Sequence, residues 1–417
     1  MLGLVAFKDQ MHIAFVISND YYSSYASPWL HLAVEKKLGS LAYQASNAFC
    51  QSVFGTSHQL RDEVTDADAR YGDALLLLND ALARAASTQL PELLVPILLL
   101  LMHTSSNRSI EESEVHIEGM RQLLIICGPE AFQKDHLWAA TTSCRAVLAS
   151  YALDHKQASF LEHENWRSAS WSPTNGLRSA LDSINDIFVA LPGLHQQSQE
   201  LRGARQDMHA SMHFLDRITH QIDRLCHWRN GWESEHSHLV WEEDRSHVIT
   251  PGYEPAYPPQ ASRLLRFAES ESAVAVSMYN AILLSISSLL SQMHPCVDVG
   301  SIATLGTACA MPGATAHTDV ALVPGVKEGL LNPVSPARQI CRAFDYQLLS
   351  ADRITAPAVY WLFPFGCARH ILAGDELWGD WAQEMLAASH AKRSHGSGIV
   401  SGGHGLYILE RCESGLD

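Results

Sequence analysis

The sequence has few positive charges. Its 417 residues hold 29 lysines and arginines against 45 aspartates and glutamates, which gives a formal net charge of −16 at pH 7. A protein that binds duplex DNA needs a basic face to displace the counterions of the phosphates. We therefore expect no direct DNA binding by this chain.

Cysteine pairs and long hydrophobic runs are also missing. The nine cysteines are scattered, and no two have the two-residue spacing common in zinc sites. This pattern favours reduced thiols in an intracellular protein, cytoplasmic or nuclear, over a disulfide framework. The apolar run at 90–102 is shorter than the roughly 20 residues that a membrane span needs, and Pro96 interrupts it. We expect no secretory signal and no membrane segment.

The motifs of common cofactor sites are missing as well. There is no Gly-x-Gly-x-x-Gly, no phosphate loop, no Gly-x-Ser-x-Gly and no Asp-Asp-x-x-Asp. The glycine-rich residues 401–405 lack the lysine of a phosphate loop. We therefore expect no cofactor.

Strand-like alternation is absent over any useful length, whereas apolar residues recur at three and four positions through most of the chain. The sequence predicts a single all-α domain over residues 1–417, a large bundle of packed helical hairpins around a long central helix. Residues 1–27 are predicted to be irregular, and 245–262 and 296–335 to be loops, because prolines or glycines gather in the loops. The longest helical patterns lie at 201–243 and 263–293, and three closing helices at 337–350, 356–372 and 376–392.

One predicted helix, residues 116–132, organises its neighbours. It begins His-Ile-Glu-Gly and ends in Gly-Pro-Glu-Ala-Phe, with Gly128 and Pro129 as its stop signal. Gly119 inside the helix costs about 1 kcal/mol relative to alanine. We therefore expect another helix to pack closely against Gly119.

A leucine-rich helix precedes this stretch, and a further helix and then Ser-Phe-Leu-Glu-His-Glu-Asn-Trp-Arg at 159–167 follow it. This order resembles the regulatory "middle homology" domain of fungal binuclear-zinc-cluster transcription factors. There, a His-x-x-Gly helix ending in Gly-Pro plus an aromatic precedes a Ser-Phe-Leu…Trp-Arg segment. The resemblance is clearest over residues 75–171. The six-cysteine cluster that supplies DNA binding in that family is missing from this chain.

Histidines are frequent at 201–243. Possible metal ligands recur there at intervals of three and four residues: His209, His213, Asp216, His220, Asp223 and His227. A separate apolar stripe lies about 100° away around the same helix: Met208, Met212, Leu215, Ile218, Ile222 and Leu225. We therefore expect the histidines to face solvent and to hold no metal.

Three tryptophans follow at 228, 232 and 241, next to acids such as Glu242 and Glu243. They would suit an aromatic pocket with an acid/base pair. Tryptophans at this spacing also pack an ordinary helix end, and we favour this interpretation.

The candidate ligand pocket is built from polar side chains on apolar helix faces: Tyr279, Tyr346, Tyr360, Trp361, Arg369 and His370. Tyr279 shares a stripe with apolar residues, so its ring should point inward and its hydroxyl needs a partner. A buried Arg369 would need a carboxylate or a bound anion, and Asp345 is the nearest candidate by residue type. In an enzyme, the candidate catalytic residues are His370, Tyr279 and Asp345. A structural polar network would use the same residues, and both alternatives stay open.

The resemblance implies a regulatory domain, linked to a secondary-metabolism gene cluster, that binds a small hydrophobic molecule or a protein partner. The alternative is a cofactor-independent enzyme of fungal natural-product biosynthesis, a cyclase or pericyclase with an apolar helical pocket. A third possibility is an interaction partner that forms a homodimer or pairs with a full-length factor. We favour the regulator.

Overall fold

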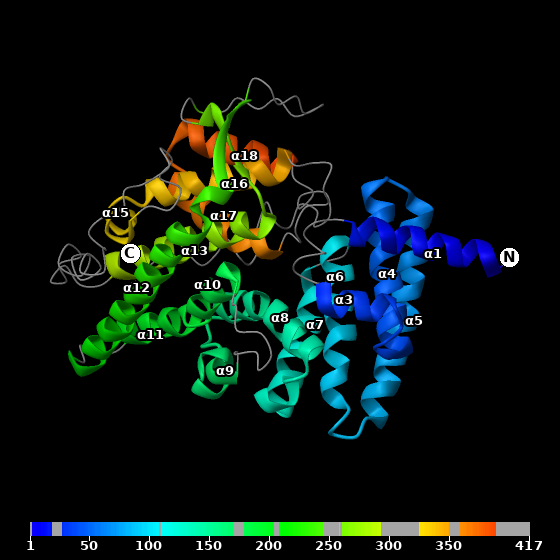
Figure 1. Ribbon diagram of the computed structural model, residues 1–417. Coiled ribbons are helices and arrows are strands. Elements are labelled where there is room, and N and C mark those ends of the chain that lie inside the picture. The colour runs from blue at the N-terminus through cyan, green and yellow to red at the C-terminus, as the bar shows by residue number, and fades with distance from the viewer. Residues whose placement is uncertain are drawn as a thin grey trace.

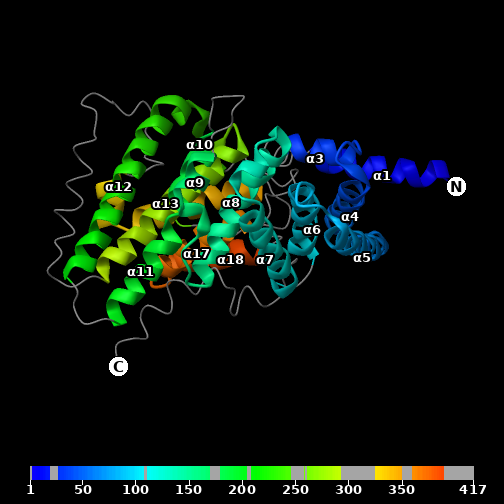
Figure 2. The ribbon, with the colours of Figure 1, turned by 90° about the horizontal axis from the view of Figure 1, so that it is seen from below.

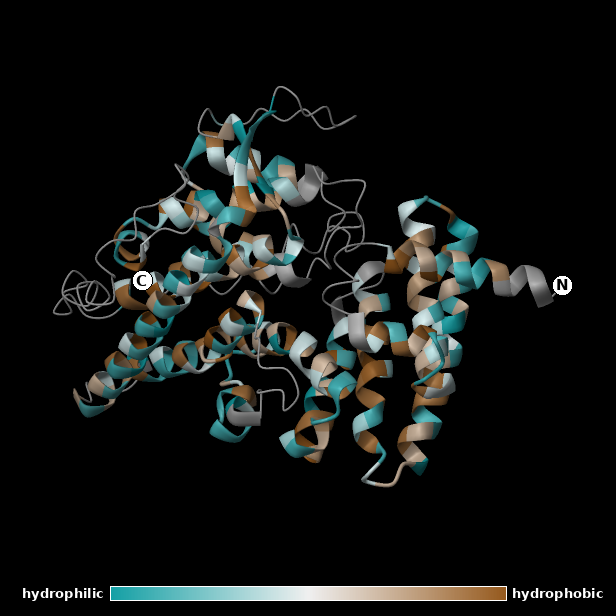
Figure 3. Ribbon diagram, in the orientation of Figure 1, coloured by the Kyte–Doolittle hydropathy of each residue, from teal (hydrophilic) through white to brown (hydrophobic). Residues whose placement is uncertain are grey.

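The computed structural model describes residues 2–18, 27–107, 110–169, 179–203, 208–245, 258, 261–292, 325–349 and 359–388. Over these residues the protein is all-α as predicted, apart from one two-stranded sheet (Figure 1). Most helices carry both hydrophilic and hydrophobic residues (Figure 3), so each can bury one face. One contiguous cluster of buried hydrophobic side chains extends from Val16 to Met385.

The N-terminal helices form a group at one side of the molecule (Figures 1 and 2). These helices are α1 (Leu2–Ile17), α3 (Ser27–Val34), α4 (Gly39–Ser57), α5 (Arg61–Arg84), α6 (Leu94–Asn107) and α7 (Ile110–Cys127). The turn η1 (Leu90–Leu93) leads into α6, which packs against both α4 and α7. Residues 94–101 of α6 are all buried, so the leucine-rich helix is the core of this group.

Two predictions in this group are wrong. Residues 1–27 contain helix α1, which packs against α4 and buries His12 and Val16. Its apolar residues surround the helix axis, so they gave no periodic signal. Nothing lies within 4 Å of the Cβ that an alanine at Gly119 would add, so no helix packs closely there.

Helix α8 (Asp135–Asp154) joins the two sides of the molecule (Figure 2). It packs against α3, α6 and α7 of the N-terminal group, and against α10, α11 and α17. The elements around it are η2 (Pro129–Phe132), η3 (Phe160–Glu162), α9 (Glu164–Ala169), α10 (Ala180–Phe188), α11 (Leu191–Gly203) and α12 (Met208–His236).

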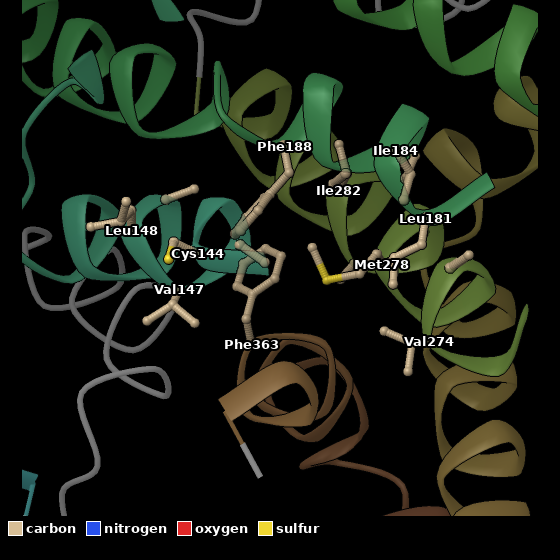
Figure 4. Close-up of a cluster of buried hydrophobic side chains, with 14 of the residues drawn as sticks. Cys144, Val147, Leu148, Leu181, Ile184, Phe188, Val274, Met278, Ile282 and Phe363 are labelled. Atoms are coloured by element: carbon tan, nitrogen blue, oxygen red, sulfur yellow. The ribbon is translucent and has the colours of Figure 1, made fainter. Parts of the chain in front are cut away.

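The predicted central helix is α13 (Ser270–Ser291). Apolar residues surround it, and it packs against α10, α15, α16 and α17. Figure 4 shows Met278 and Ile282 of α13 beside Phe188 of α10 and Phe363 of α17. By its length and apolar composition α13 also qualifies as a candidate membrane span, but most of this helix is buried inside the protein. A core helix passes the same test, so α13 carries no argument about a membrane.

A β-hairpin replaces the ends of two predicted helices. Strand β1 (Val240–Asp244) pairs antiparallel with β2 (Arg263–Phe267), so the helical patterns at 201–243 and 263–293 were extended too far. The turn η4 (Ser237–Leu239) separates α12 from β1. Each strand is only five residues long, too short for alternation to stand out beside a long helical pattern. Most of the predicted loop at 245–262 lies outside the described residues.

The C-terminal helices cover α13. They are α15 (Val326–Leu331), α16 (Val334–Leu349), α17 (Val359–Leu372) and α18 (Glu376–Ala388), close to the three predicted closing helices. The predicted loop at 296–335 extends too far, because its last residues form α15 and the start of α16. The short α15 packs on α13, where Gly329 lies against Leu283. Residues 296–324 of that loop lie outside the described part of the chain.

Candidate functional site

A cleft of about 450 Å³ lies between α7, α8 and the segment that follows α8. Its lining residues are Arg121, Leu148, Tyr151, Ala152, Gln157, Ala158, Ser159, Phe160, Glu162, His163 and Glu164. Small-molecule sites usually occupy roughly 300–1,000 Å³ and combine apolar surface with a few polar groups. The cleft has this size and this mixed lining.

The segment after α8 is fixed by its backbone and by α11. Lys156 adopts the left-handed conformation, with a φ of 55°, just after α8 ends. The N–H of Ala158 donates to the side-chain oxygen of Gln196 at 2.6 Å. The hydroxyl of Ser159 accepts from the N–H of Leu161 at 3.3 Å, so Ser159 caps the turn η3. Ser159 and Phe160 of the Ser-Phe-Leu stretch therefore form part of one wall of the cleft.

Arg121 stands on the α7 side, and its charge is already paired. Its Nε and Nη2 each donate to the carboxylate of Glu118 at 2.7 Å, and Gln122 donates to the same group at 2.8 Å. The hydrogen bonds from Arg121 lower the pKa of Glu118 to about 2. On α8, burial and then the charge of Glu118 raise the pKa of Tyr151. The charge of Glu118 therefore acts on groups of both α7 and α8.

Glu162 stands on the opposite side and is also paired. Arg217 of α12 donates to Glu162 through Nη2 and to Gln197 of α11 through Nη1 at 2.7 Å. The pair lies directly against Gly193 of α11, where a Cβ would overlap Oε2 of Glu162. The cleft wall is therefore tied to α11 and α12 through an ion pair that packs closely against glycine at 193.

A titratable carboxyl lies beside the cleft. Asp154 is one helical turn beyond Tyr151, at the end of α8. Burial, and then the charge of Glu114, raise its pKa to about 7. Asp154 is not among the residues that line the cleft, so its raised pKa reflects burial at the end of α8.

The structure buries two of the predicted pocket residues. Tyr279 is 0% exposed, and its ring stacks on Trp228 with the centroids 5.2 Å apart. Burial raises the pKa of its hydroxyl strongly. The hydroxyl of Tyr346 donates to the backbone oxygen of Phe267 at 3.0 Å and so fixes α16 to the hairpin. Both rings point inward.

The predicted pairing of Arg369 with Asp345 is wrong. The buried Asp345 forms an ion pair with Arg245, which follows the hairpin strand β1. Arg369 and His370, at the end of α17, are half-buried. Sequence reasoning paired residues by type and could not see that α16 meets the hairpin. Tyr360 and Trp361 lie in α17, but their side chains lie outside the described part.

The histidines of α12 face solvent as predicted: His209, His213, His220 and His227 are all exposed. The predicted apolar stripe is wrong at its start, because Met208 and Met212 are 76% and 60% exposed. Phe214 is buried instead, together with the predicted core residues further along α12. Among the described residues, no group of three or more histidines, cysteines or acids could hold a metal ion.

The tryptophans at the end of α12 pack the core, as we favoured. Trp228 and Trp232 are buried, and Trp228 Nε1 donates to the backbone oxygen of Ala180 at 2.8 Å. Trp241 lies on β1 and is 47% exposed. The neighbouring acids pair with arginines, Glu242 with Arg342 and Glu243 with Arg266. These groups hold the hairpin in place.

Sequence reasoning missed a buried polar network in the N-terminal group. The hydroxyl of Tyr71 lies 2.8 Å from Nε2 of His116, and its ring stacks on His103 at 4.7 Å. His103 in turn lies 3.1 Å from a carboxylate oxygen of Asp68. Burial lowers the pKa of His116 to about 4, so this histidine is neutral at pH 7. The sequence did offer one signal for this network, because His116 lies on the same helix face as Met120 and Leu123.

No family model, curated protein or solved structure matches the chain. The likeness to the fungal regulators therefore rests on the order and spacing of the residues named above. Function must be argued from the cleft and its surroundings.

Proposed function

We propose that this chain is a regulatory, ligand-binding domain similar to that of fungal zinc-cluster transcription factors. It acts in the cytoplasm or nucleus, serves a secondary-metabolism gene cluster, and does not bind DNA itself. The observation that carries this proposal is the position of the cleft. The two segments that resemble the fungal family, the His-x-x-Gly helix and the Ser-Phe-Leu…Trp-Arg segment, lie on its two sides.

Charged side chains at the cleft also interact with other helices of the protein. Glu162 on its wall pairs with Arg217 of α12, and Glu118 of α7 pairs with Arg121 and acts through its charge on Tyr151 of α8. A ligand that shifts either pair would change how these helices pack, and a protein partner can bind the two arrangements with different affinities. Regulation needs this kind of connection.

The enzyme alternative has less support. A catalytic acid or base must reach the substrate. Asp345 is bound by Arg245, Tyr279 is buried against Trp228, and His370 is not among the residues that line the cleft. We therefore keep cofactor-independent catalysis as an outcome to be tested and not as the proposal.

A cleft-filling substitution tests the regulator. The full chain, fused to a heterologous DNA-binding module in a fungal host, should change the transcription of a reporter. Ala152 lines the cleft, and Ala152→Trp should block ligand entry and fix the reporter output at one level. Ala83→Trp, at an exposed position of α5, is the matched control and should behave as the wild type. Unchanged reporter transcription in the presence of the fusion would contradict the proposal. Equal transcription with Ala152→Trp and Ala83→Trp would also contradict it.

A further inference from the structure

The cleft contains charged side chains but offers a ligand little uncompensated charge. Its one arginine, Arg121, donates twice to Glu118 at 2.7 Å. Its inner carboxylate, Glu162, accepts from Arg217. The remaining acid, Glu164, is 80% exposed at the rim and lies 3.7 Å from Arg167. Each charge of the lining thus has a partner of opposite sign within the protein.

Apart from the exposed imidazole of His163 at the rim, the rest of the lining is uncharged and consists of two kinds of surface. Leu148 and Ala152 of α8 and the ring of Phe160 supply the apolar part. Phe160 is held by an edge contact with Trp166, with the centroids 5.2 Å apart. Tyr151 and Gln157 add a phenol and an amide, which are neutral hydrogen-bonding groups.

An ionic ligand would find this lining unfavourable. An anion would have to lose water and then compete with Glu118 for Arg121, and a cation would compete with Arg217 for Glu162. Both pairs are about one-quarter to one-third exposed, so an ion that takes one partner exchanges one partly screened contact for another and gains little. A neutral ligand leaves both pairs intact.

From this charge pattern we infer that the cleft takes an uncharged amphipathic molecule, with a flat apolar body and hydroxyl or carbonyl groups. The body lies on Leu148, Ala152 and Phe160, and the polar groups hydrogen-bond near Tyr151 and Gln157. The inference rests on the proposed function and adds the chemical class of its ligand.

Three probes with one naphthalene body separate the classes: naphthol, naphthoate and naphthylmethylammonium. Calorimetric titration of the full chain at pH 7 and low salt should give naphthol a higher affinity than either ion, because an ion loses hydration without gaining a free partner of opposite charge. Ala152→Trp should abolish naphthol binding, and Ala83→Trp should leave it unchanged.

Two charge variants make the test sharper. Glu118→Gln leaves Arg121 without its carboxylate, so naphthoate should gain at least about tenfold. Arg121→Gln leaves Glu118 negative, so naphthylmethylammonium should gain instead. Each variant needs a melting curve that shows it is folded, and Glu162→Gln provides a second variant that should also favour the anion.

The outcomes separate the two proposals. Tighter binding of either ion than of naphthol by the wild type would overturn the neutral class and leave the regulator standing. No Ala152→Trp-sensitive binding of any probe would remove the cleft as a ligand site, and with it both proposals.

Discussion

Gly193 makes the wall of the cleft possible at the scale of a single residue. A Cβ at this position would overlap Oε2 of Glu162 and lie 3.0 Å from Nη2 of Arg217. Since Glu162 can move only by loosening its ion pair, Gly193→Ala should lower the free energy of unfolding by about 1 kcal/mol. Urea denaturation measures the change.

Gly119 is the matched control, because it also lies within a helix. Nothing lies within 4 Å of its added Cβ. Gly119→Ala should raise the free energy of unfolding by about 0.5–1 kcal/mol, since it removes backbone freedom from the unfolded chain. Equal changes in both variants would show that local crowding at Gly193 does not matter.

His116 gives stability a pH dependence. Burial lowers the pKa of His116 to about 4 in the folded state, from a value near 6.5 in the unfolded state. Between these two pH values the folded state therefore binds fewer protons than the unfolded state. The contribution of His116 to the free energy of unfolding is fully present above pH 6.5 and is lost as the pH falls toward 4. Between pH 7 and pH 5 the free energy of unfolding should fall by roughly 1–2 kcal/mol through this group.

His116→Asn isolates this effect from other titrating groups. Asp154 acts in the opposite direction, because its raised pKa lets the folded state take up a proton as the pH falls below 7. The measurement is therefore the difference between wild type and His116→Asn in urea midpoints at pH 7 and pH 5. An identical pH dependence of the two proteins would rule out His116 as the source.

At the scale of elements, the hairpin is fixed to α16 by a buried ion pair. Arg245 and Asp345 are nearly or fully inaccessible, and Arg245 Nε also donates to the backbone oxygen of Ala261 at 3.1 Å. Asp345→Asn leaves Arg245 uncompensated and should cost about 3–5 kcal/mol of folding free energy. Thermal and urea unfolding measure the loss.

A surface pair provides the comparison. Arg84 and Asp80 pair on exposed α5, and such pairs contribute about 0–1 kcal/mol, so Asp80→Asn should change little. The double change Arg245→Met with Asp345→Leu should recover most of the stability, because it removes both charges. A loss in the double variant as large as in Asp345→Asn would mean that shape, and not charge, holds the hairpin.

At the scale of the whole molecule, the net charge of −16 decides the expected behaviour toward DNA. Repulsion from the phosphates should prevent retention of duplex DNA by the purified chain at physiological salt. A gel-shift titration measures this directly. Sub-micromolar binding with a steep salt dependence would contradict the prediction.

The sequence by itself determined most of the helices, the central place of α13 and the inward rings of Tyr279 and Tyr346, but it missed α1 and α15. It also determined the exposure of the α12 histidines. These features depend on residues three or four apart, and helical periodicity reports such neighbours directly.

Only the tertiary structure decided the cleft, the hairpin and the ion pairs. Arg245 and Asp345 are 100 positions apart, and Glu162 and Arg217 are 55 apart. Local periodicity does not specify which surfaces of different helices meet. The choice among many possible partners is made by the packing of the whole core, because one arrangement buries the apolar faces and pairs the charges at the same time.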